Sequence, residues 1–104
     1  MTNDSNRKSY RISYYGPIKS IVHKSEESLS EESLSEPTMN GVLKALGRKY
    51  GPEFQELVFH DKEINRAVNI FVNGVCLTQR NDFECKLEFD SEIEIVLISQ
   101  AAGG

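Results

Sequence analysis

The sequence predicts an α+β fold in which one main helix covers one face of a mixed β-sheet. Short runs of alternating apolar residues lie near both ends of the chain, and an apolar stripe with helical spacing lies between them. An Asn73-Gly74 pair separates two further apolar runs. Side chains alternate between the faces of a strand and recur about every 3.6 residues on a helix, so these patterns identify the element type. The chain has 104 residues, the length of one domain.

The first strand is expected over residues 10–15, where aromatic and β-branched side chains precede the turn signal Gly16-Pro17. The polar residues 1–9 are expected to form a disordered N-terminal arm. The folded domain is then assigned to residues 10–99, and residues 100–104 are expected to form a flexible tail.

An acidic Ser/Glu-rich insert is predicted over residues 24–37, where Ser-Glu-Glu-Ser-Leu occurs twice and begins again before Pro37. A run this polar is expected to contribute no core. Its serines are open to two interpretations, phosphorylation targets or part of a solvated loop held open by like charge, and the second needs fewer assumptions. A second strand, paired with the first as a hairpin, is expected from residues 18–23 and part of this run.

The main helix is predicted over residues 39–50. Its apolar residues occupy one helical face at positions i, i+3, i+4 and i+7: Met39, Val42, Leu43 and Leu46. Thr38 is a natural N-cap, Gly51 is expected to be a left-handed cap, and Pro52 prevents continuation. Gly41 in the first turn is expected to mark a close approach of the helix to the sheet.

The second half of the chain is predicted to hold a short helix and three strands. A helical turn beginning at Pro52 would point three apolar side chains inward: Phe54, Leu57 and Val58. Asn73-Gly74 between apolar runs indicates a two-residue hairpin, because both residues accept positive φ at little cost. Residues 78–89 are expected to be a loop with a short helical or strand piece, and Asp90-Ser91 turns the chain into the last strand.

Strand parity predicts an exposed apolar patch. If Ile93, Ile95 and Leu97 face the helix, Val96 and Ile98 face away from it. By the same rule, the strand that carries Val68, Ile70 and Val72 inward turns Phe71 outward. We therefore expect Phe71, Val96 and Ile98 to form a surface on which a partner protein docks. The alternative is that an insert or a second copy covers these side chains.

The tail that follows the last strand is the strongest functional signal. The spacer Gln100-Ala101-Ala102 and the pair Gly103-Gly104 lack bulk, so they can thread into a narrow channel of a partner. The carboxylate of Gly104 is then expected to be the reactive group, with Ala101, Ala102 and Gly103 threading behind it. The bland alternative is a frayed chain end.

Composition and charge limit the classes of partner. The net charge of −4 argues against a nucleic-acid surface, which requires clustered Lys and Arg, and favours a protein with a basic docking surface. No apolar run approaches the roughly 18 residues of a membrane helix, so no membrane contact and a cytoplasmic location are expected. Cys76 and Cys85 have no metal-site spacing and are expected to be free thiols.

Residue motifs give no support for catalysis by the chain itself. His23 and His60 stand outside any ligand or acid/base spacing, and no Gly-rich phosphate loop occurs. The chain is therefore expected to be a substrate and carrier with no bound cofactor or metal. A plain protein-interaction module, in which the glycines are incidental, is a further alternative because one fold hosts many functions.

The order of elements resembles the prokaryotic ubiquitin-like sulfur carriers, which include the small subunit of molybdopterin synthase and the thiamine-pathway carrier. Five segments carry the resemblance: Tyr14-Tyr15-Gly16-Pro17, Pro37-Thr38, Lys49-Tyr50-Gly51, Ile70-Phe71-Val72-Asn73-Gly74 and Gly103-Gly104. The resemblance implies a ubiquitin-like β-grasp fold, in which the first and last strands pair in parallel at the centre of the sheet.

The resemblance also implies a function. A ubiquitin-activating-type enzyme that uses ATP and Mg²⁺ would adenylate Gly104, and sulfur transfer would give a thiocarboxylate for cofactor or tRNA-thiolation biosynthesis. The partners would be this enzyme and a synthase or sulfurtransferase subunit. Conjugation of Gly104 to lysines of target proteins uses the same tail and activation, so sulfur carriage and protein modification remain open alternatives.

Overall fold

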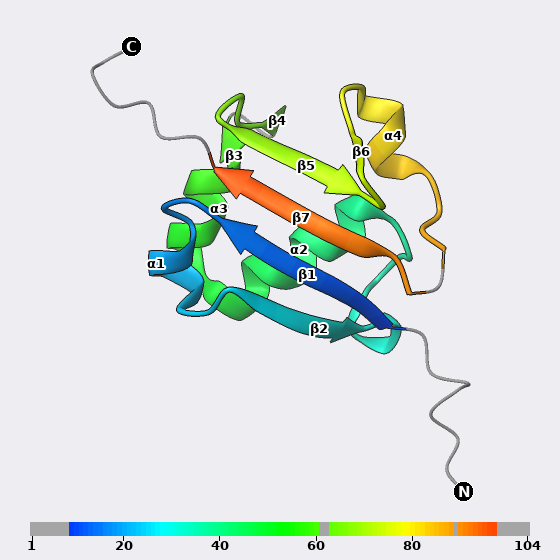
Figure 1. The fold of residues 1–104 in the computed structure, drawn as a ribbon, viewed down its shortest axis with the longest axis horizontal. Coiled ribbons are helices and arrows are strands. Elements are labelled where there is room, and N and C mark those ends of the chain that lie inside the picture. Colours follow the sequence, from blue (N-terminus) through cyan, green and yellow to red (C-terminus); the bar gives the residue numbers. More distant parts are fainter. Residues whose placement is uncertain (1–8, 61–62, 89, 98–104) are drawn as a thin grey trace, which may run out of the picture.

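The computed structural model describes residues 9–60, 63–88 and 90–97. The chain forms a five-stranded mixed sheet, a separate two-stranded sheet and several helices (Figure 1). The elements follow in chain order: β1 Ser9–Tyr15, α1 Lys19–Val22, β2 Glu26–Ser30, η2 Glu31–Ser33, α2 Met39–Tyr50, α3 Pro52–Val58, β3 Phe59–His60, β4 Glu63–Ile64, β5 Val68–Val72, β6 Val75–Cys76, α4 Arg80–Glu84 and β7 Glu92–Leu97.

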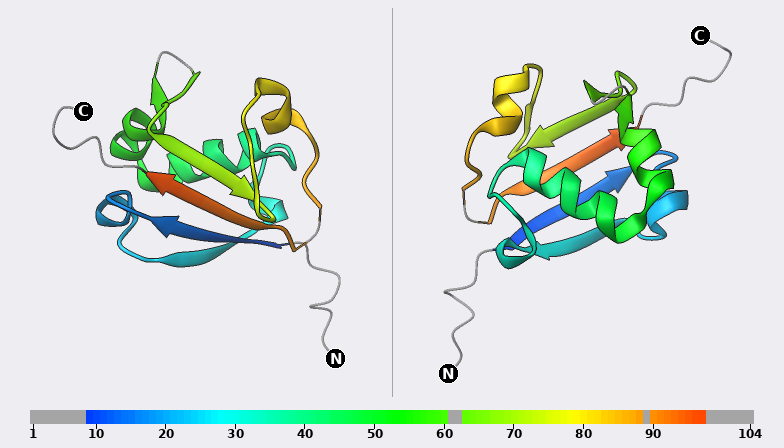
Figure 2. Two further views of the ribbon diagram at one scale, coloured as in Figure 1. Left: turned by 45° about the horizontal axis from the view of Figure 1, so that its top comes forward. Right: turned by 180° about the vertical axis from the view of Figure 1, so that it is seen from behind.

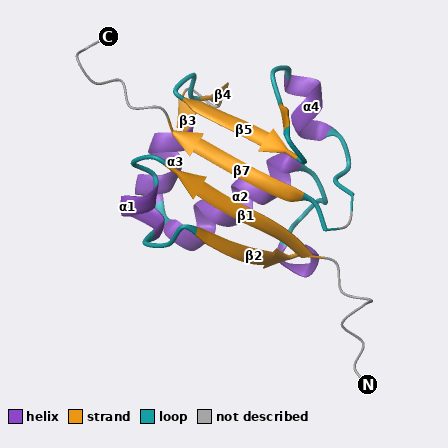
Figure 3. Cartoon of the chain, viewed as in Figure 1, coloured by secondary structure: helices purple, strands orange, loops and turns teal. Residues whose placement is uncertain are grey.

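The sheet has the strand order β2-β1-β7-β5-β6 (Figure 3). β1 and β7 pair in parallel at its centre, while β2 and β5 flank them antiparallel. α2 runs across one face of the sheet and leaves the other face open (Figure 2). This arrangement confirms the predicted β-grasp fold with one main helix on one face.

The core lies between α2 and the covered face of the sheet. The helix buries its apolar stripe, and β7 buries Ile93, Ile95 and Leu97 as strand parity predicted. On β5, Val68 and Ile70 are buried and Val72 is partly buried. Burying one such side chain contributes about 1.5–3 kcal/mol, so the alternation along β5 and β7 specifies which face is covered.

The bounds of α2 agree with the prediction, and Thr38 caps it by accepting a hydrogen bond from the Gly41 amide at 3.1 Å. Gly51 has a positive φ of 87°, but its ψ of −164° lies outside the left-handed helical region that was expected. A close approach at Gly41 is present, as expected, but the neighbouring segment is not the predicted one. A Cβ at Gly41 would lie 2.0 Å from the carbonyl oxygen of Glu36, so the close approach is to the segment before the helix, not to the sheet.

The hairpin and the short helices agree with the sequence patterns. Asn73 and Gly74 both have positive φ, 51° and 86°, as the primed turn between β5 and β6 requires. α3 buries Phe54 and Val58, and Leu57 is partly buried against the core. α4 is the short helical piece expected within residues 78–89.

Residues 18–37 agree with the prediction only in part. Residues 19–22 form α1 and contribute nothing to a strand. The second strand is β2, which lies wholly inside the run predicted to be a solvated insert, and Leu29 is buried there. The antiparallel pairing of β2 with β1 confirms that part of this run joins the second strand. The expectation that the run contributes no core was wrong, because Glu27 and Leu29 face the covered side of the sheet, while Ser28 between them faces the open side.

The predictions for the N-terminal arm and the tail lie largely outside the described residues. Ser9, which was assigned to the arm, is the first residue of β1. Residues 1–8 and 98–104 are not described. Two short features were not indicated by the sequence patterns: the strand pair β3–β4 and the 3₁₀ turn η2.

Candidate functional site

The candidate docking surface lies on the open face of the sheet. Val96 on β7 is in register with Tyr15 on β1 and with Asn69 on β5. Phe71 lies opposite Glu94, one step along the same face, so it is a diagonal neighbour of Val96. Phe71 and Val96 are partly buried and Tyr15 is 45% exposed. We call Tyr15, Phe71 and Val96 the open-face patch.

Two of the three predicted docking residues are therefore on one face, and the third is not described. Ile98 lies outside the described residues. Tyr15 was not among the predicted docking residues, although the alternation along β1 indicates it: Tyr10, Ile12 and Tyr14 are buried, so the next residue faces outward.

Carboxylates border the open-face patch. Glu94 lies between β1 and β5 on this face, and the Tyr15 hydroxyl donates to its Oε2 at 3.4 Å. Glu92 on β7 faces the same side of the sheet and is exposed. Arg11 lies opposite it and is the one basic residue among the described outward positions of β1, β5 and β7. The patch therefore offers apolar contact beside negative charge, which suits a basic partner surface.

The end of β7, from which the tail departs, is fixed on both sides. Val68 on β5 pairs with Leu97, and on the other side Gly16 follows β1 with a φ of +88°. A Cβ at Gly16 would lie 2.2 Å from the carbonyl oxygen of Leu97. Only glycine permits this approach, so the turn after β1 lies directly against the last residue of β7. β7 thus ends between β5 and the turn after β1, beside the open-face patch.

A buried carboxylate cluster ties β2 to the end of α2. Glu27 accepts hydrogen bonds from the hydroxyls of Tyr14 and Tyr50, the second at 2.5 Å, and from Lys49 Nζ at 2.5 Å. Lys24 Nζ lies 3.7 Å from the same carboxylate, whose side chain is 7% exposed.

The cluster shifts the pKa values of its members. Burial acts to raise the pKa of Glu27, but the hydrogen bonds from Lys49, Tyr14 and Tyr50 outweigh it and the pKa is lowered. Burial and the adjacent carboxylate raise the pKa of Tyr14 and of Tyr50. The carboxylate is thus held ionised and enclosed by three donors, an arrangement that stabilises the fold and leaves little access for a substrate.

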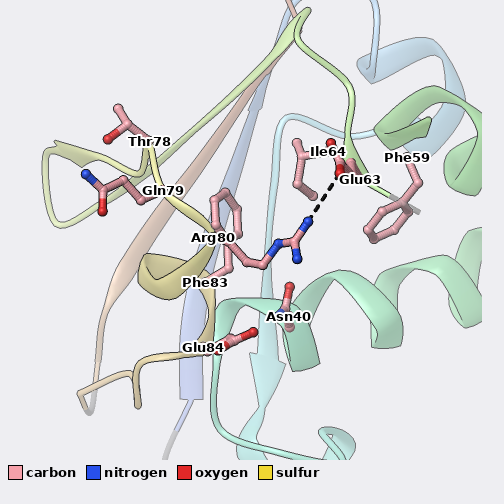
Figure 4. Close-up of a pocket in the computed structure, with 9 residues that line it drawn as sticks. All are labelled: Asn40, Phe59, Glu63, Ile64, Thr78, Gln79, Arg80, Phe83 and Glu84. Atoms are coloured by element: carbon pink, nitrogen blue, oxygen red, sulfur yellow. Dashed lines mark hydrogen bonds and ion pairs between the residues drawn. The ribbon is translucent and has the colours of Figure 1, made fainter. Parts of the chain in front are cut away.

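A separate hollow of about 420 Å³ lies between α4, β4 and the start of α2 (Figure 4). Arg80 reaches across it, with Nη2 at 3.2 Å from Glu63 Oε2, and both side chains are exposed. The hollow is lined by Asn40, Phe59, Glu63, Ile64, Thr78, Gln79, Arg80, Phe83 and Glu84. None of these nine residues is a histidine, cysteine or lysine.

Metal and thiol chemistry find no assembled site in the described part of the chain. No group of three His, Cys, Asp or Glu residues there is arranged to hold a metal ion. Cys76 is partly buried and Cys85 is exposed, and both are free thiols, as predicted. Among the same residues, no helix is long and apolar enough to cross a membrane.

Comparison with solved structures shows the same fold in small proteins of archaea and of a eukaryote. Small archaeal modifier protein 1 from Methanosarcina acetivorans matches with a TM-score of 0.73 at 20% identity, over 95% of this chain and 99% of that one. A putative molybdopterin converting factor subunit 1 from Pyrococcus furiosus matches with a TM-score of 0.68 at 16% identity, over 88% and 99%. Urm1 from Trypanosoma brucei gives 0.72 at 15% identity, over 98% and 100%.

No protein-family model and no curated protein matches the sequence. The three solved structures named above are at most 20% identical to this chain in sequence, so the likeness is one of fold. It spans nearly the whole length of each neighbour. The predicted resemblance is confirmed at that level, and the chain has the ubiquitin-like β-grasp fold found in proteins named as modifiers and as a molybdopterin converting factor subunit.

Proposed function

We propose that this chain is a ubiquitin-like sulfur carrier. A partner enzyme adenylates the carboxylate of Gly104, and the adenylate is converted to a thiocarboxylate that donates sulfur in cofactor or tRNA-thiolation biosynthesis. The observation that carries the proposal is the junction at Leu97, where β7 is fixed against Gly16 beside the open-face patch and leads to the slim sequence 100–104. The likeness to a molybdopterin converting factor subunit supports the same assignment.

The chemistry follows from the poor reactivity of a free carboxylate. Its charge repels nucleophiles and oxide is a very poor leaving group. Attack of a Gly104 carboxylate oxygen on the α-phosphorus of ATP expels pyrophosphate and forms an acyl-adenylate. Attack of sulfide on the acyl carbon then expels AMP and leaves the thiocarboxylate. A persulfide gives the same product once a thiol cleaves the acyl disulfide.

ATP, Mg²⁺ and the catalytic groups belong to the partner in this proposal, and the chain acts as its substrate. The activating enzyme would bind the open-face patch through a surface that is apolar at its centre and basic at its rim, facing Glu92 and Glu94. Ala101, Ala102 and Gly103 would thread into its channel. A synthase or sulfurtransferase subunit would then receive the tail, and we place this chemistry in the cytoplasm, where ATP is supplied.

Protein conjugation is the second candidate function. Three of the solved structures with the same fold are of small archaeal modifier protein 1, which favours transfer of Gly104 to target lysines. An enzyme thiolate would then attack the adenylate in place of sulfide, and a lysine amine would resolve the thioester to an isopeptide. The fold, patch and tail would serve both routes.

Substitution of Phe71 by Asp tests the docking step. The variant would be expressed in the native cell, and intact mass would give the fraction of chains that carry a thiocarboxylate or become conjugated. A buried interface does not tolerate an unpaired charge, so we expect at least about a tenfold loss. Val75→Asp is the matched control. Val75 is 65% exposed, and it pairs with Val72, so its side chain is on the opposite face of the sheet from Phe71.

Equal modification of the Phe71 and Val75 variants, with native circular dichroism for both, would refute docking through the patch. A chain that carries neither a thiocarboxylate nor an isopeptide in a cell that needs it would refute both candidate functions. It would leave a non-covalent interaction module as the function.

A further inference from the structure

The Ser/Glu-rich run carries exposed serines that the proposed function does not use. Ser28 and Ser33 occupy the same position in the two copies of Ser-Glu-Glu-Ser-Leu, and both side chains are exposed. A glutamate follows each serine after three residues, at Glu31 and at Glu36. Serine among carboxylates suits a protein kinase whose substrate groove is basic, because the charges are complementary.

Ser28 lies beside an arginine of the neighbouring strand. β1 and β2 are adjacent (Figure 3), and their register pairs Ser28 with Arg11 on the open face. The Tyr14 amide donates to the Ser25 carbonyl at 2.8 Å, so Tyr14 and Ser25 are a hydrogen-bonded pair. Such pairs alternate along an antiparallel ladder, which makes Arg11 and Ser28 a non-hydrogen-bonded pair. Cβ atoms of these pairs lie about 4.5–5.5 Å apart, so the guanidinium can reach a phosphate on Ser28.

The charge of Arg11 is not used by the described part of the fold. Its side chain is exposed and forms no ion pair within residues 9–60, 63–88 and 90–97, although Glu92 faces it in register from β7. A guanidinium binds a phosphate through two parallel hydrogen bonds, with a geometry that lysine does not offer. Arg11 is therefore available to a phosphate on β2.

Three carboxylates share the open face with this pair. Glu26 lies two residues before Ser28 on β2, and it would repel a phosphate there. Glu92 and Glu94 lie on β7, on the far side of β1. Arg11 thus stands between the phosphate and Glu92, while Glu26 is the nearest opposing charge.

The remaining acidic residues distinguish the two serines. Glu27 faces the covered side of the sheet, where hydrogen-bond donors enclose its carboxylate. Ser33 ends the turn η2, directly after Glu31 and Glu32, and it has no register partner on β1. A phosphate on Ser33 would therefore meet like charge, so the geometry favours Ser28 over Ser33.

We propose that Ser28 is a phosphorylation site and that Arg11 binds the phosphate across β1 and β2. Ser28 Oγ attacks the γ-phosphorus of ATP held by the kinase, and the new O–P bond forms as the bond to the bridging β–γ oxygen breaks. ADP leaves, and the hydroxyl proton passes to a base of the kinase. The phosphate adds a charge of about −1.5 to −2 at pH 7, so the open face becomes more acidic. Faster docking of a partner with a basic rim would follow, and this consequence alone rests on the proposed function.

Mass spectrometry of the chain isolated from its native cell, with phosphatase inhibitors present, tests the site. The fragments should place a phosphate on Ser28, and Ser28→Ala should remove it. A chain without phosphate on Ser28, whether it is unmodified or phosphorylated only at Ser33 or elsewhere, would overturn the proposal.

Phosphoserine inserted during translation in place of Ser28 tests the contact with Arg11. Phosphoserine in place of Ser35, an exposed residue between η2 and α2, is the control. Binding by Arg11 lowers the second pKa of the phosphate from its usual value near 6, whereas Glu26 raises it. We expect ³¹P NMR titration to give a pKa lower by about 0.5 or more at position 28 than at position 35. Arg11→Gln should abolish this difference and Arg11→Lys should keep part of it, while equal pKa values with and without Arg11 would overturn the proposal.

The effect on docking is measured by the rate at which newly made chains become modified at Gly104 in the native cell. Ser28→Ala should slow this modification about three- to tenfold relative to Ser35→Ala, because it removes the added negative charge. Equal rates would overturn the effect on docking. If Gly104 is modified in no chain, the proposed function fails, and the phosphate mass and the ³¹P titration still decide the site.

Discussion

Substitution of Gly16 by Ala tests whether the end of β7 is held by the turn after β1. Gly16 and Gly74 have nearly equal φ values, +88° and +86°, so alanine incurs the same backbone penalty of about 1–2 kcal/mol at both. The two sites differ in space. A Cβ at Gly74 meets nothing within 4 Å. A Cβ at Gly16 lies 2.2 Å from the Leu97 carbonyl oxygen, well under 3.0 Å, below which Cβ contacts essentially never occur in proteins.

Relief of this overlap requires β1 and β7 to separate at their ends, and overpacking of this kind costs about 1–3 kcal/mol more. We therefore expect Gly16→Ala to destabilise the fold by about 2–5 kcal/mol and Gly74→Ala by about 1–2 kcal/mol. The change in unfolded-chain entropy is common to both and cancels in the comparison. The extra loss at Gly16 should lower Tm by roughly 4 °C or more.

Urea unfolding followed by circular dichroism measures the difference, provided that both variants keep the same m value. Amide shifts of Leu97 and Val68 should change in the Gly16 variant and remain unchanged in the Gly74 variant. Equal stability of the two variants would refute the argument that Gly16 fixes the origin of the tail.

Three further predictions concern the fold. Glu27→Ala leaves three donors without their acceptor and should cost about 1–3 kcal/mol, while Glu26→Ala, an exposed neighbour, should cost under about 0.5 kcal/mol in the same unfolding assay. The lowered pKa of Glu27 adds stability that is complete above the ordinary value of 4.5 and is lost as pH falls through the folded value. The difference in unfolding free energy between the unaltered chain and Glu27→Ala should therefore shrink below pH 4.5, and a difference that stays constant with pH would contradict this. Thr38→Ala removes the cap on the Gly41 amide and should cost about 1 kcal/mol, and an unchanged midpoint would show that the cap is not needed.

Elements with strong local signals could be predicted from the sequence. The bounds of α2 followed from its apolar stripe and from Thr38, and the turn between β5 and β6 followed from Asn73-Gly74. Strand parity correctly placed Phe71 and Val96 on one face. Each of these signals acts within a few residues, where spacing or a φ requirement decides the structure.

Elements that depend on contacts distant in sequence could not be predicted. The run that contains β2 was expected to contribute no core, because composition does not reveal that Glu27 obtains its partners from Tyr14, Lys49 and Tyr50. The approach of Gly16 to Leu97 also joins residues far apart in the chain.

Intact mass spectrometry of the protein isolated from its native cell, followed by fragmentation, shows whether the carboxylate of Gly104 is activated. We expect a mass increase equal to the exchange of one oxygen for sulfur, located on Gly104 by the fragments and absent when Gly103 and Gly104 are deleted. Fragmentation is essential because oxidation of methionine or cysteine adds nearly the same mass elsewhere. A mass increase that maps only to those side chains, with no isopeptide to Gly104 on any lysine, would contradict the claim that Gly104 is activated.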